Sequence, residues 1–254
     1  MRIVEIETKP RLISIVIPNY FMNKAGRVIQ DGDEALWFAR HCFEKIENHT
    51  SLPYELILAD NGSVVGKDLL YEKADVLIRN KKNLGFGPGC NQGFKMAKGD
   101  WVCCMNNDIF VWPGWMEALI KTFEDNDDCG VAMPALMKQT KDGKEALKFK
   151  EIDISRNFFK YGPRAEFGSC WLIRKDIMDE VGLFDETFKI GFGEDRDYWR
   201  RIRQAGYETY RTHKTRVFHQ GNVTIGKIED RRKYTSANRE YLKKKWNIKD
   251  DNYK

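Results

Sequence analysis

Two aspartates that follow apolar runs are well suited to hold a divalent metal ion together with a phosphate-bearing ligand. Asp60 ends the run YELILAD, and Asp108 follows the run WVCCM with Asn106 and Asn107 between. If both runs are strands of one parallel sheet, their carboxyl ends open into a common crevice. Carboxylate and amide oxygens in that crevice suit Mg2+ or Mn2+. The alternative for Asp60 is an Asx-type turn with the following glycine, and the motif DNGS taken alone favours the turn.

A second acidic group opens the arginine-rich segment that follows GFG (191–193). Glu194 and Asp195 stand where a helix would begin, with Asp197 close behind them. The helix macrodipole favours acids at this position, which is a sufficient structural reason for them. A carboxylate there could equally serve as a general base. His219 ends another apolar run and gains a functional role only if the fold returns it to these acids, since a lone histidine is more often structural.

The segment NLGFGPGCNQG (83–93) contains four glycines and leads into a helical pattern. Backbone N–H groups in such a segment can approach a phosphate closely. Its glycine spacing matches neither the P-loop pattern nor G-x-G-x-x-G. By itself the segment is therefore weak evidence for a phosphate site.

The elements that must position these residues alternate along the first half of the chain. Strand-like runs alternate with segments whose apolar residues have helical spacing, and Pro113 suits a first helical turn. The runs are at 12–18, 54–60, 74–80 and 100–106, and the helical segments are at 33–49, 87–99 and 113–125. This alternation predicts an α/β fold with a mainly parallel sheet and helices on both faces.

The second half of the chain is less regular. A polar segment without clear periodicity (138–155) predicts an excursion from the fold. The elements expected after it are an apolar stretch (168–182), a helix (194–206), two short strands (207–212 and 215–220) and a basic helix (230–246). No internal repeat and no linker rich in Gly, Pro or Ser divides the chain, so we expect a single domain.

The composition is that of a soluble globular protein, with 254 residues of which 42% are hydrophobic and 32% charged. No apolar run is long enough to span a bilayer, and the first residues lack the core of a signal peptide. These features predict no transmembrane segment and a cytoplasmic location. The six cysteines form no C-x-x-C pair, which predicts buried free thiols.

The net charge of +5 is a property of the C-terminus. Residues 227–254 hold ten Lys and Arg against five Asp and Glu, and the remaining residues carry 33 of each sign. A solvated helix face is the simplest explanation. An anionic partner, such as nucleic acid or a membrane surface, is the alternative.

Eight segments follow one another in a set order along most of the chain. They are SIVIPNY (14–20), ELILADNGS (55–63), NLGFGPGCNQG (83–93), GDWVCCMNNDIFVWPGWMEAL (99–119), GSCWLIRKDIMDEVGLFDETF (168–188), GFGEDRDYWRRIRQAGY (191–207), VFHQGNVT (217–224) and NREYLKKKW (238–246). Together they resemble the family 2 glycosyltransferases of the GT-A fold.

The resemblance implies a Rossmann-like, mainly parallel sheet flanked by helices, in a single domain with a C-terminal helical extension. The GT-A domain would occupy residues 1–226. Within it, residues 1–110 would form the nucleotide-sugar-binding half and residues 111–226 the acceptor-binding half. Residues 227–254 would form the basic helical extension.

In this family an acidic motif at a strand end, usually D-x-D, holds a divalent metal on the donor diphosphate. Here the motif reads NND, so the resemblance implies Asp108 as a ligand of Mn2+ or Mg2+, with His219 as a second ligand. Asp60 would recognise the nucleotide base. Together with Asp60, the donor-binding residues would be Pro18, Asn19, Tyr20, Asn61, Asn83, Gly85, Asn106, Asn107 and Trp171. The floor beneath the donor sugar would be Gly168, Ser169, Cys170 and Trp171.

Asp195 matches the catalytic base of inverting family members, and Glu194 would support it or touch the acceptor. The implied reaction moves a hexosyl or pentosyl group from a UDP-, dTDP- or GDP-linked donor to a hydroxyl of a saccharide, a lipid-linked glycan or a protein. Two alternatives remain. The NND motif motivates a nucleotide-sugar-binding protein without catalysis, and the basic C-terminus motivates a transferase that acts on nucleic acid.

A second acidic motif, DGD (31–33), resembles D-x-D but follows the first strand rather than the fourth. We therefore interpret Asp31 and Asp33 as turn and helix-cap residues. The polar segment at 138–165 is expected to cover the acceptor side of the crevice.

Overall fold

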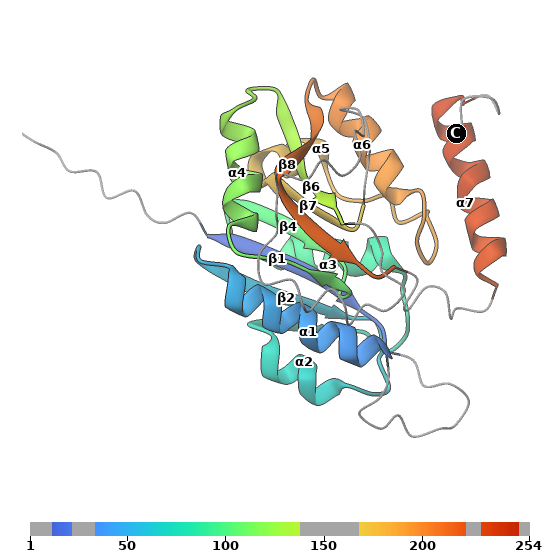
Figure 1. Cartoon of the computed structure of the whole chain (residues 1–254). Coiled ribbons are helices and arrows are strands. Elements are labelled where there is room, and N and C mark those ends of the chain that lie inside the picture. Colours follow the sequence, from blue (N-terminus) through green and yellow to red (C-terminus); the bar gives the residue numbers. More distant parts are fainter. Residues whose placement is uncertain (1–11, 22–33, 138–167, 222–229, 249–254) are drawn as a thin grey trace, which may run out of the picture.

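The computed structural model describes residues 12–21, 34–137, 168–221 and 230–248 as one sheet covered by helices (Figure 1). The strands are β1 (Ile13–Asn19), β2 (Tyr54–Asp60), β3 (Val76–Arg79), β4 (Trp101–Met105), β5 (Ile109–Phe110), β6 (Cys129–Leu136), β7 (Cys170–Arg174) and β8 (Glu208–His219). The helices are α1 (Glu34–His49), α2 (Lys67–Lys73), α3 (Phe86–Met96), α4 (Trp115–Glu124), α5 (Lys175–Val181), α6 (Glu194–Gln204) and α7 (Arg231–Trp246).

The sheet has the strand order β3-β2-β1-β4-β7-β6-β8-β5 in the described part of the chain. β1 pairs in parallel with β2 and β4, and β2 pairs in parallel with β3. β7 runs antiparallel to β4, so the sheet becomes mixed beyond β4. The predicted α/β architecture is confirmed. In the β1–β2 register Asn19 lies opposite Asp60, which puts both at one edge of the sheet.

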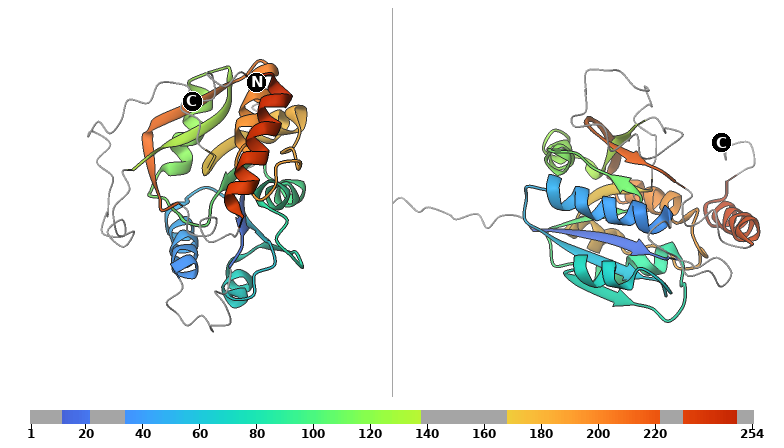
Figure 2. Two further views of the ribbon diagram at one scale, coloured as in Figure 1. Left: turned by 90° about the vertical axis from the view of Figure 1, so that its right-hand side faces the viewer. Right: turned by 60° about the horizontal axis from the view of Figure 1, so that its bottom comes forward.

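The strands are apolar along most of their length because helices cover both faces of the sheet. In β1, Ile13, Ile15 and Ile17 belong to the core under α1, α2 and α4. Val16 points to the other face, where α3, α5 and α6 pack. The left view of Figure 2 shows α1 and α4 on one side of the sheet and α3 on the other. A strand that is buried on both faces is apolar at nearly every position, and such strands are easily recognised in a sequence.

Several elements differ from those expected. α2 and β6 were not predicted, and the two short strands expected at 207–212 and 215–220 form the single strand β8. α4 begins after Gly114, whose φ is +78°, so Pro113 lies before the helix and not in its first turn. The DGD motif, the polar segment at 138–165 and the proposed boundary at residue 226 lie outside the described residues.

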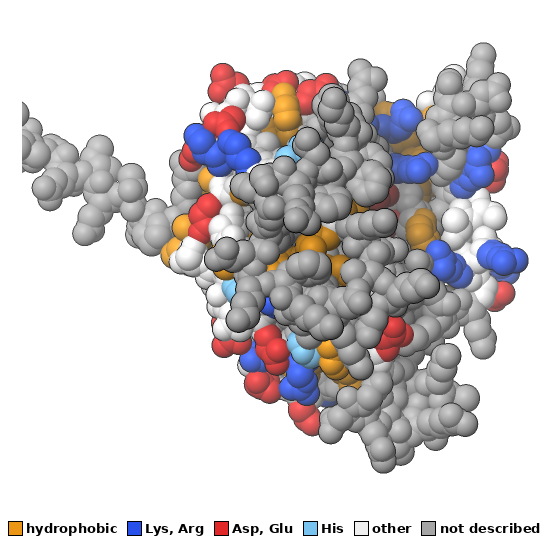
Figure 3. Space-filling model, viewed as in Figure 1, with side chains coloured by type: hydrophobic (Ala, Val, Ile, Leu, Met, Phe, Trp, Pro, Cys, Tyr) orange, Lys and Arg blue, Asp and Glu red, His pale blue; other side chains and the backbone are white. Residues whose placement is uncertain are grey.

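The predicted basic helix is confirmed as α7, which lies at one end of the sheet beside α6 (Figure 1). Lys and Arg side chains gather over α7 on the right of the space-filling view (Figure 3). All six cysteines are free and buried, as predicted. Within the described ranges, no helix has both the length and the apolar character needed to cross a membrane.

Candidate active site

Asp60 is buried at the edge of the sheet where β1 and β2 end. Its Oδ1 accepts a hydrogen bond from the Ser63 amide at 2.9 Å, which is the Asx-type turn that the motif favours. Its Oδ2 lies 3.1 Å from Arg79 Nε, but this ion pair lacks hydrogen-bond alignment. The Asn61 amide donates to the Asn19 carbonyl at 2.8 Å and joins the two strand ends. One carboxylate thus forms the turn and also keeps an oxygen without a hydrogen bond to the described residues.

An open pocket of about 560 Å³ lies beside this turn. Three cationic side chains contribute to its wall. The lining residues are Gly62, Ser63, Val64, Lys67, Arg79, Asn80 and Lys81. A basic pocket of this size can accept a phosphorylated small molecule.

The glycine-rich segment packs closely on Asn61. Asn61 Nδ2 donates to the Gly85 carbonyl at 2.9 Å, and Asn83 Oδ1 accepts from the Gly85 amide at 2.8 Å. A Cβ on Gly89 would lie 2.9 Å from Asn61 Nδ2, and one on Gly85, whose φ is +99°, would lie 2.9 Å from the Ile190 nitrogen. Close packing therefore explains Gly85 and Gly89. A donor-binding role for Asn61, Asn83 and Gly85 stays a prediction.

The NND motif follows β4 and joins the strand edge to β8. Asn107 Nδ2 donates to Asn19 Oδ1 at 3.1 Å. Asp108, only 5% exposed, accepts a hydrogen bond on Oδ2 from the Gly221 amide at 2.9 Å. Its Oδ1 lies 3.3 Å from Nε2 of His219. The antiparallel β5–β8 pairing, in which Ile109 lies opposite His219, produces this contact.

Asp108 and His219 could hold one divalent ion together. Cis ligands of an octahedral ion with bonds of about 2.1 Å lie about 3 Å apart, and the two side-chain atoms here are 3.3 Å apart. Asn106 Nδ2 is also 3.3 Å from His219 Nε2, and Asn106 Oδ1 has no hydrogen-bond partner among the described residues. The described residues contain no group of three acidic, His or Cys side chains that could hold a metal. Donor oxygens and water would have to complete the coordination.

Glu194 and Asp195 are the first two residues of α6. Glu194 is buried, and its Oε2 has no hydrogen-bond partner in the described part of the protein. Burial, together with the charge of Asp195, raises the pKa of Glu194 to about 8. Asp195 is partly exposed, and its Oδ1 accepts from the Arg196 amide at 2.7 Å. Burial therefore favours the protonated form of Glu194 at neutral pH.

Gly168 and Ser169 connect Asp195 to the NND motif. A Cβ on Gly168 would lie 2.5 Å from Asp195 Oδ2, so this carboxylate lies against the glycine backbone. The Ser169 carbonyl accepts from the Asn106 amide at 2.8 Å. The structure thereby brings together the α6 acids, the NND motif and His219, which are far apart in the sequence.

Two residues differ in role from what the sequence suggested. Trp171, expected to line the donor sugar, is fully buried, and its ring packs edge-on against Trp199 at a centroid distance of 5.4 Å. It supports the site from within the core. Asp197 belongs to the acidic group in the sequence but is buried and bonds Arg201 Nε at 3.0 Å. Pro18 and Tyr20 remain partly exposed at the edge of β1.

The fold is that of the GT-A glycosyltransferases. A structure of GalNAc-T7 with UDP, GalNAc and Mn2+ matches 94% of this chain and 52% of its own, with a TM-score of 0.61 and 15% sequence identity. At this identity the likeness concerns the fold alone.

The chain belongs to the family described as glycosyl transferase family 2. The model of that family matches residues 38–182, which is more than half of the chain. The match includes Asp60 and the NND motif and ends before α6.

Curated relatives of this chain are also named as glycosyltransferases. The uncharacterized glycosyltransferase YwdF of Bacillus subtilis (strain 168) is 29% identical over an alignment of 153 residues, and the match covers 56% of this chain and 55% of that protein. The chain thus spans about half the length of this relative. The N-acetylglucosaminyl-diphospho-decaprenol L-rhamnosyltransferase of Mycobacterium tuberculosis (strain ATCC 25618 / H37Rv) is 25% identical over an alignment of 218 residues, and the match covers 70% of this chain and 70% of that protein.

Proposed function

We propose that this glycosyltransferase inverts the anomeric configuration of a nucleotide-linked sugar and uses Asp195 as its general base. The observation that carries the proposal is the contact between Asp195 and Gly168, next to the Ser169 carbonyl that bonds Asn106. These contacts put a partly exposed carboxylate beside the NND motif. A donor whose diphosphate lies at that motif would present its anomeric carbon toward Asp195.

Asp60 is proposed to recognise the base of a UDP-, dTDP- or GDP-linked donor. Its Oδ2 lacks a hydrogen-bond partner among the described residues and could accept from a base N–H group. Since Asp60 is buried beside Arg79, base binding on this account requires the Arg79 side chain, which is 29% exposed, to shift. The basic pocket next to Asp60 supports the same location for an anionic ligand.

Asp108 and His219 are the residues proposed to hold a divalent metal. When bound, Mn2+ or Mg2+ would neutralise the charge that develops on the departing nucleoside diphosphate. The Mn2+ in the GalNAc-T7 structure supports a metal in a protein of this fold. Asn106, which approaches His219, and Asn107, which bonds Asn19, would contact the ribose and phosphates beside the metal.

Asp195 would remove the proton of the acceptor hydroxyl while its oxygen attacks the anomeric carbon from the face opposite the diphosphate. The C–O bond to the acceptor forms as the bond to the diphosphate oxygen breaks, so one displacement inverts the configuration. Glu194, protonated below a pH of about 8, leaves a single negative charge on the pair. On this proposal the carboxylate that acts as the base is that of the partly exposed Asp195.

The acceptor is proposed to be a saccharide, a protein or a lipid-linked glycan. The name of the mycobacterial relative, which specifies a diphospho-decaprenol substrate, favours the lipid-linked glycan. A nucleic-acid acceptor has less support, because Lys245 of the basic helix pairs with Asp185 and Asp197 inside the protein.

The experiment is a transfer assay with Mn2+ across UDP-, dTDP- and GDP-sugars, with the anomeric configuration of the product read by NMR. Asp195→Asn should lower transfer by about 100- to 10,000-fold without loss of donor binding. The matched control is Asp68→Asn, which changes an exposed acid in the first turn of α2. Wild-type donor binding without transfer to any acceptor would favour a non-catalytic protein, and a product with retained configuration would refute the inverting mechanism.

A further inference from the structure

We propose that α7 positions the catalytic acids, with Asn238 as the central positioning residue; this inference rests on the proposed role of Asp195. α7 contacts the chain on both sides of the Glu194–Asp195 pair. It bonds the α5–α6 loop (182–193) before the pair and Asp197 after it. The basic helix, which composition alone suggests to be a solvated surface, thus becomes a part of the active-site framework.

The α5–α6 loop enters α6 through a backbone that needs external support. Ile190 and Phe192 have φ values of +67° and +73°, and Gly193 has a φ of +105°. Side-chain-bearing residues rarely adopt such values, and a β-branched residue at positive φ is an outlier. These conformations persist only where surrounding contacts impose them. The residues that make those contacts therefore determine the positions of Glu194 and Asp195.

Asn238 supplies the contacts on one side of the loop. This side chain is 4% exposed, and its Nδ2 lies within hydrogen-bond distance of three loop carbonyls: Lys189 at 2.9 Å, Gly191 at 2.9 Å and Phe192 at 3.0 Å. Its Oδ1 accepts from the Lys189 amide at 3.0 Å. An amide is needed because the same side chain donates and accepts, which neither a carboxylate nor an apolar group can do.

α3 supports the opposite side of the loop. The Phe86 amide donates to the Ile190 carbonyl at 2.8 Å. Asn91 Nδ2 donates to the Phe184 carbonyl at 2.9 Å, and its Oδ1 accepts from the Phe184 amide at 2.9 Å. The loop is therefore held between α3, which also contacts the donor edge, and α7.

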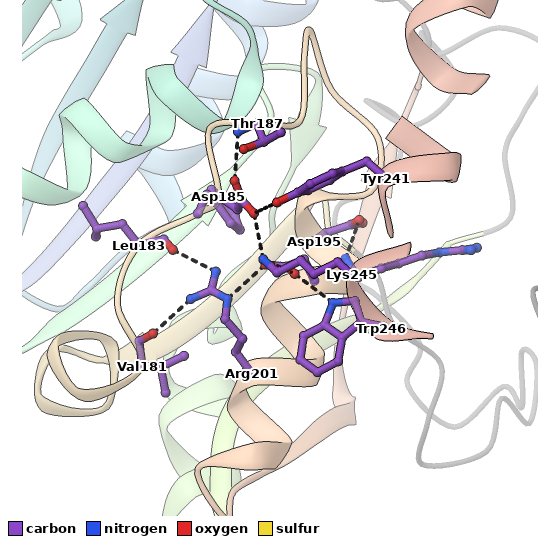
Figure 4. Close-up of polar contacts among 12 residues, drawn as sticks. Val181, Leu183, Asp185, Thr187, Asp195, Arg201, Tyr241, Lys245 and Trp246 are labelled. Atoms are coloured by element: carbon purple, nitrogen blue, oxygen red, sulfur yellow. Dashed lines mark hydrogen bonds and ion pairs between the residues drawn. The ribbon is translucent and has the colours of Figure 1, made fainter. Parts of the chain in front are cut away.

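The C-terminal turns of α7 reach past the loop to α6 (Figure 4). Trp246 Nε1 donates to Asp197 Oδ1 at 2.9 Å, and Lys245 Nζ pairs with the same oxygen at 2.7 Å. Lys245 and the Tyr241 hydroxyl also bond Asp185 Oδ2, at 2.7 and 2.8 Å. Although burial raises the pKa of Asp185, the hydrogen bonds from Lys245, Thr187 and Tyr241 together lower it below the ordinary value. α7 thus bonds the chain both before and after the Glu194–Asp195 pair.

The test compares Asn238→Leu, which removes the amide, with Ser236→Ala on the exposed face of the same helix. We expect kcat to fall by about 100-fold in Asn238→Leu, because small displacements of a catalytic group cost that much. The donor Kd, measured by calorimetry, should be unchanged, and Ser236→Ala should behave as wild type. An unchanged kcat in a folded Asn238→Leu would overturn the inference, as would an equal loss of kcat and donor affinity.

A second variant tests the inference if Asn238→Leu does not fold. Trp246→Phe keeps a ring but removes the hydrogen bond to Asp197, and we expect a smaller fall in kcat without a change in donor Kd. Wild-type kcat in Trp246→Phe would refute the anchoring of α6 by this end of α7.

Hydrogen exchange separates this inference from the proposed function. Amides of residues 184–197 should exchange faster in Asn238→Leu than in wild type, with α1 unchanged, whatever the enzyme's activity. If those amides exchange at the wild-type rate, the positioning role fails even where Asp195→Asn is inactive. If they exchange faster while Asp195→Asn retains full activity, the anchoring stands and the proposed base is wrong.

Discussion

The strand edge proposed to bind the donor and the loop that leads into the proposed catalytic acids are built in opposite ways. At the edge, Asn19 and Asp60 end adjacent parallel strands and are joined by regular register. The α5–α6 loop has no regular structure, contains two non-glycine residues at positive φ, and depends on Asn238 of α7. The proposed donor recognition therefore rests on the sheet, whereas placement of the proposed base rests on contacts between segments far apart in the chain.

Among the variants that keep Asp195, we expect the largest effect on transfer from replacing Asp108, the proposed metal ligand. Asp108→Ala should lower transfer by roughly 100- to 1,000-fold, since a metal contributes several kcal/mol to stabilising the leaving group. Titration of Mn2+ against the transfer rate checks this, with His219→Ala expected to require more Mn2+. Wild-type transfer by Asp108→Ala at low Mn2+ would refute its role as a ligand.

Loss of the Asp60 charge should act on donor binding. Asp60→Asn should weaken the donor Kd by roughly 10- to 100-fold, the value of a hydrogen bond to a charged group. The rate at saturating donor should change much less, because the α5–α6 loop is not altered. Calorimetry measures the Kd, and Asp68→Asn again serves as the charge-matched control. Equal donor affinity in both variants would remove Asp60 from the donor site.

The buried Glu194 should make stability depend on pH. Its pKa of about 8 lies above the ordinary value of 4.5, so the folded state keeps a proton that the unfolded chain has released between these values. The free energy of unfolding of wild type should therefore fall as pH rises through that window, by the order of a few kcal/mol.

Glu194→Gln removes this contribution, so its Tm should exceed that of wild type by a growing margin as pH rises toward about 8. Thermal unfolding at several pH values is the measurement. Glu240→Gln, which changes an acid that is 74% exposed, is the control. Parallel Tm profiles for Glu194→Gln and wild type would contradict a protonated, buried Glu194.

The smallest effect is expected in the strained loop itself. Ile190→Gly should change the free energy of unfolding by about 1 kcal/mol or less, since relief of the positive φ offsets the conformational entropy of glycine. In β1, Ile17→Ala should lower the free energy of unfolding by about 2–5 kcal/mol, because it leaves a cavity in the core. Urea unfolding of the two variants measures this contrast. A large loss of stability in Ile190→Gly would mean that the loop is not strained.

The sequence predicted the strands of this sheet edge well because their signals are local. β1, β2 and β4 are largely apolar; β1 and β2 end on Asn19 and Asp60, and β4 is followed directly by Asn106. The rest depends on pairings between distant segments. His219 reaches Asp108 only through the β5–β8 pairing. β8 was divided into two strands because polar residues interrupt its apolar pattern, and its register with β6 shifts between Pro134 and Ala135.

The composition of α7 did not predict its role either, because that role depends on contacts with distant segments of the chain. Its charge pattern predicts a basic helix, which is present. Nothing in the pattern indicates that Lys245 pairs with two buried or half-buried aspartates, or that Asn238 faces a loop. The burial of Trp171 is likewise a consequence of packing, because an aromatic residue next to a strand end suits a ligand site and a core equally well.

The most direct test of the division between donor edge and catalytic loop is to measure the transfer rate and the donor Kd together in Asp195→Asn and Asp60→Asn. We predict that Asp195→Asn loses transfer with an unchanged donor Kd, and that Asp60→Asn loses donor affinity while retaining most of the rate at saturating donor. Transfer at the wild-type rate by Asp195→Asn would contradict the account.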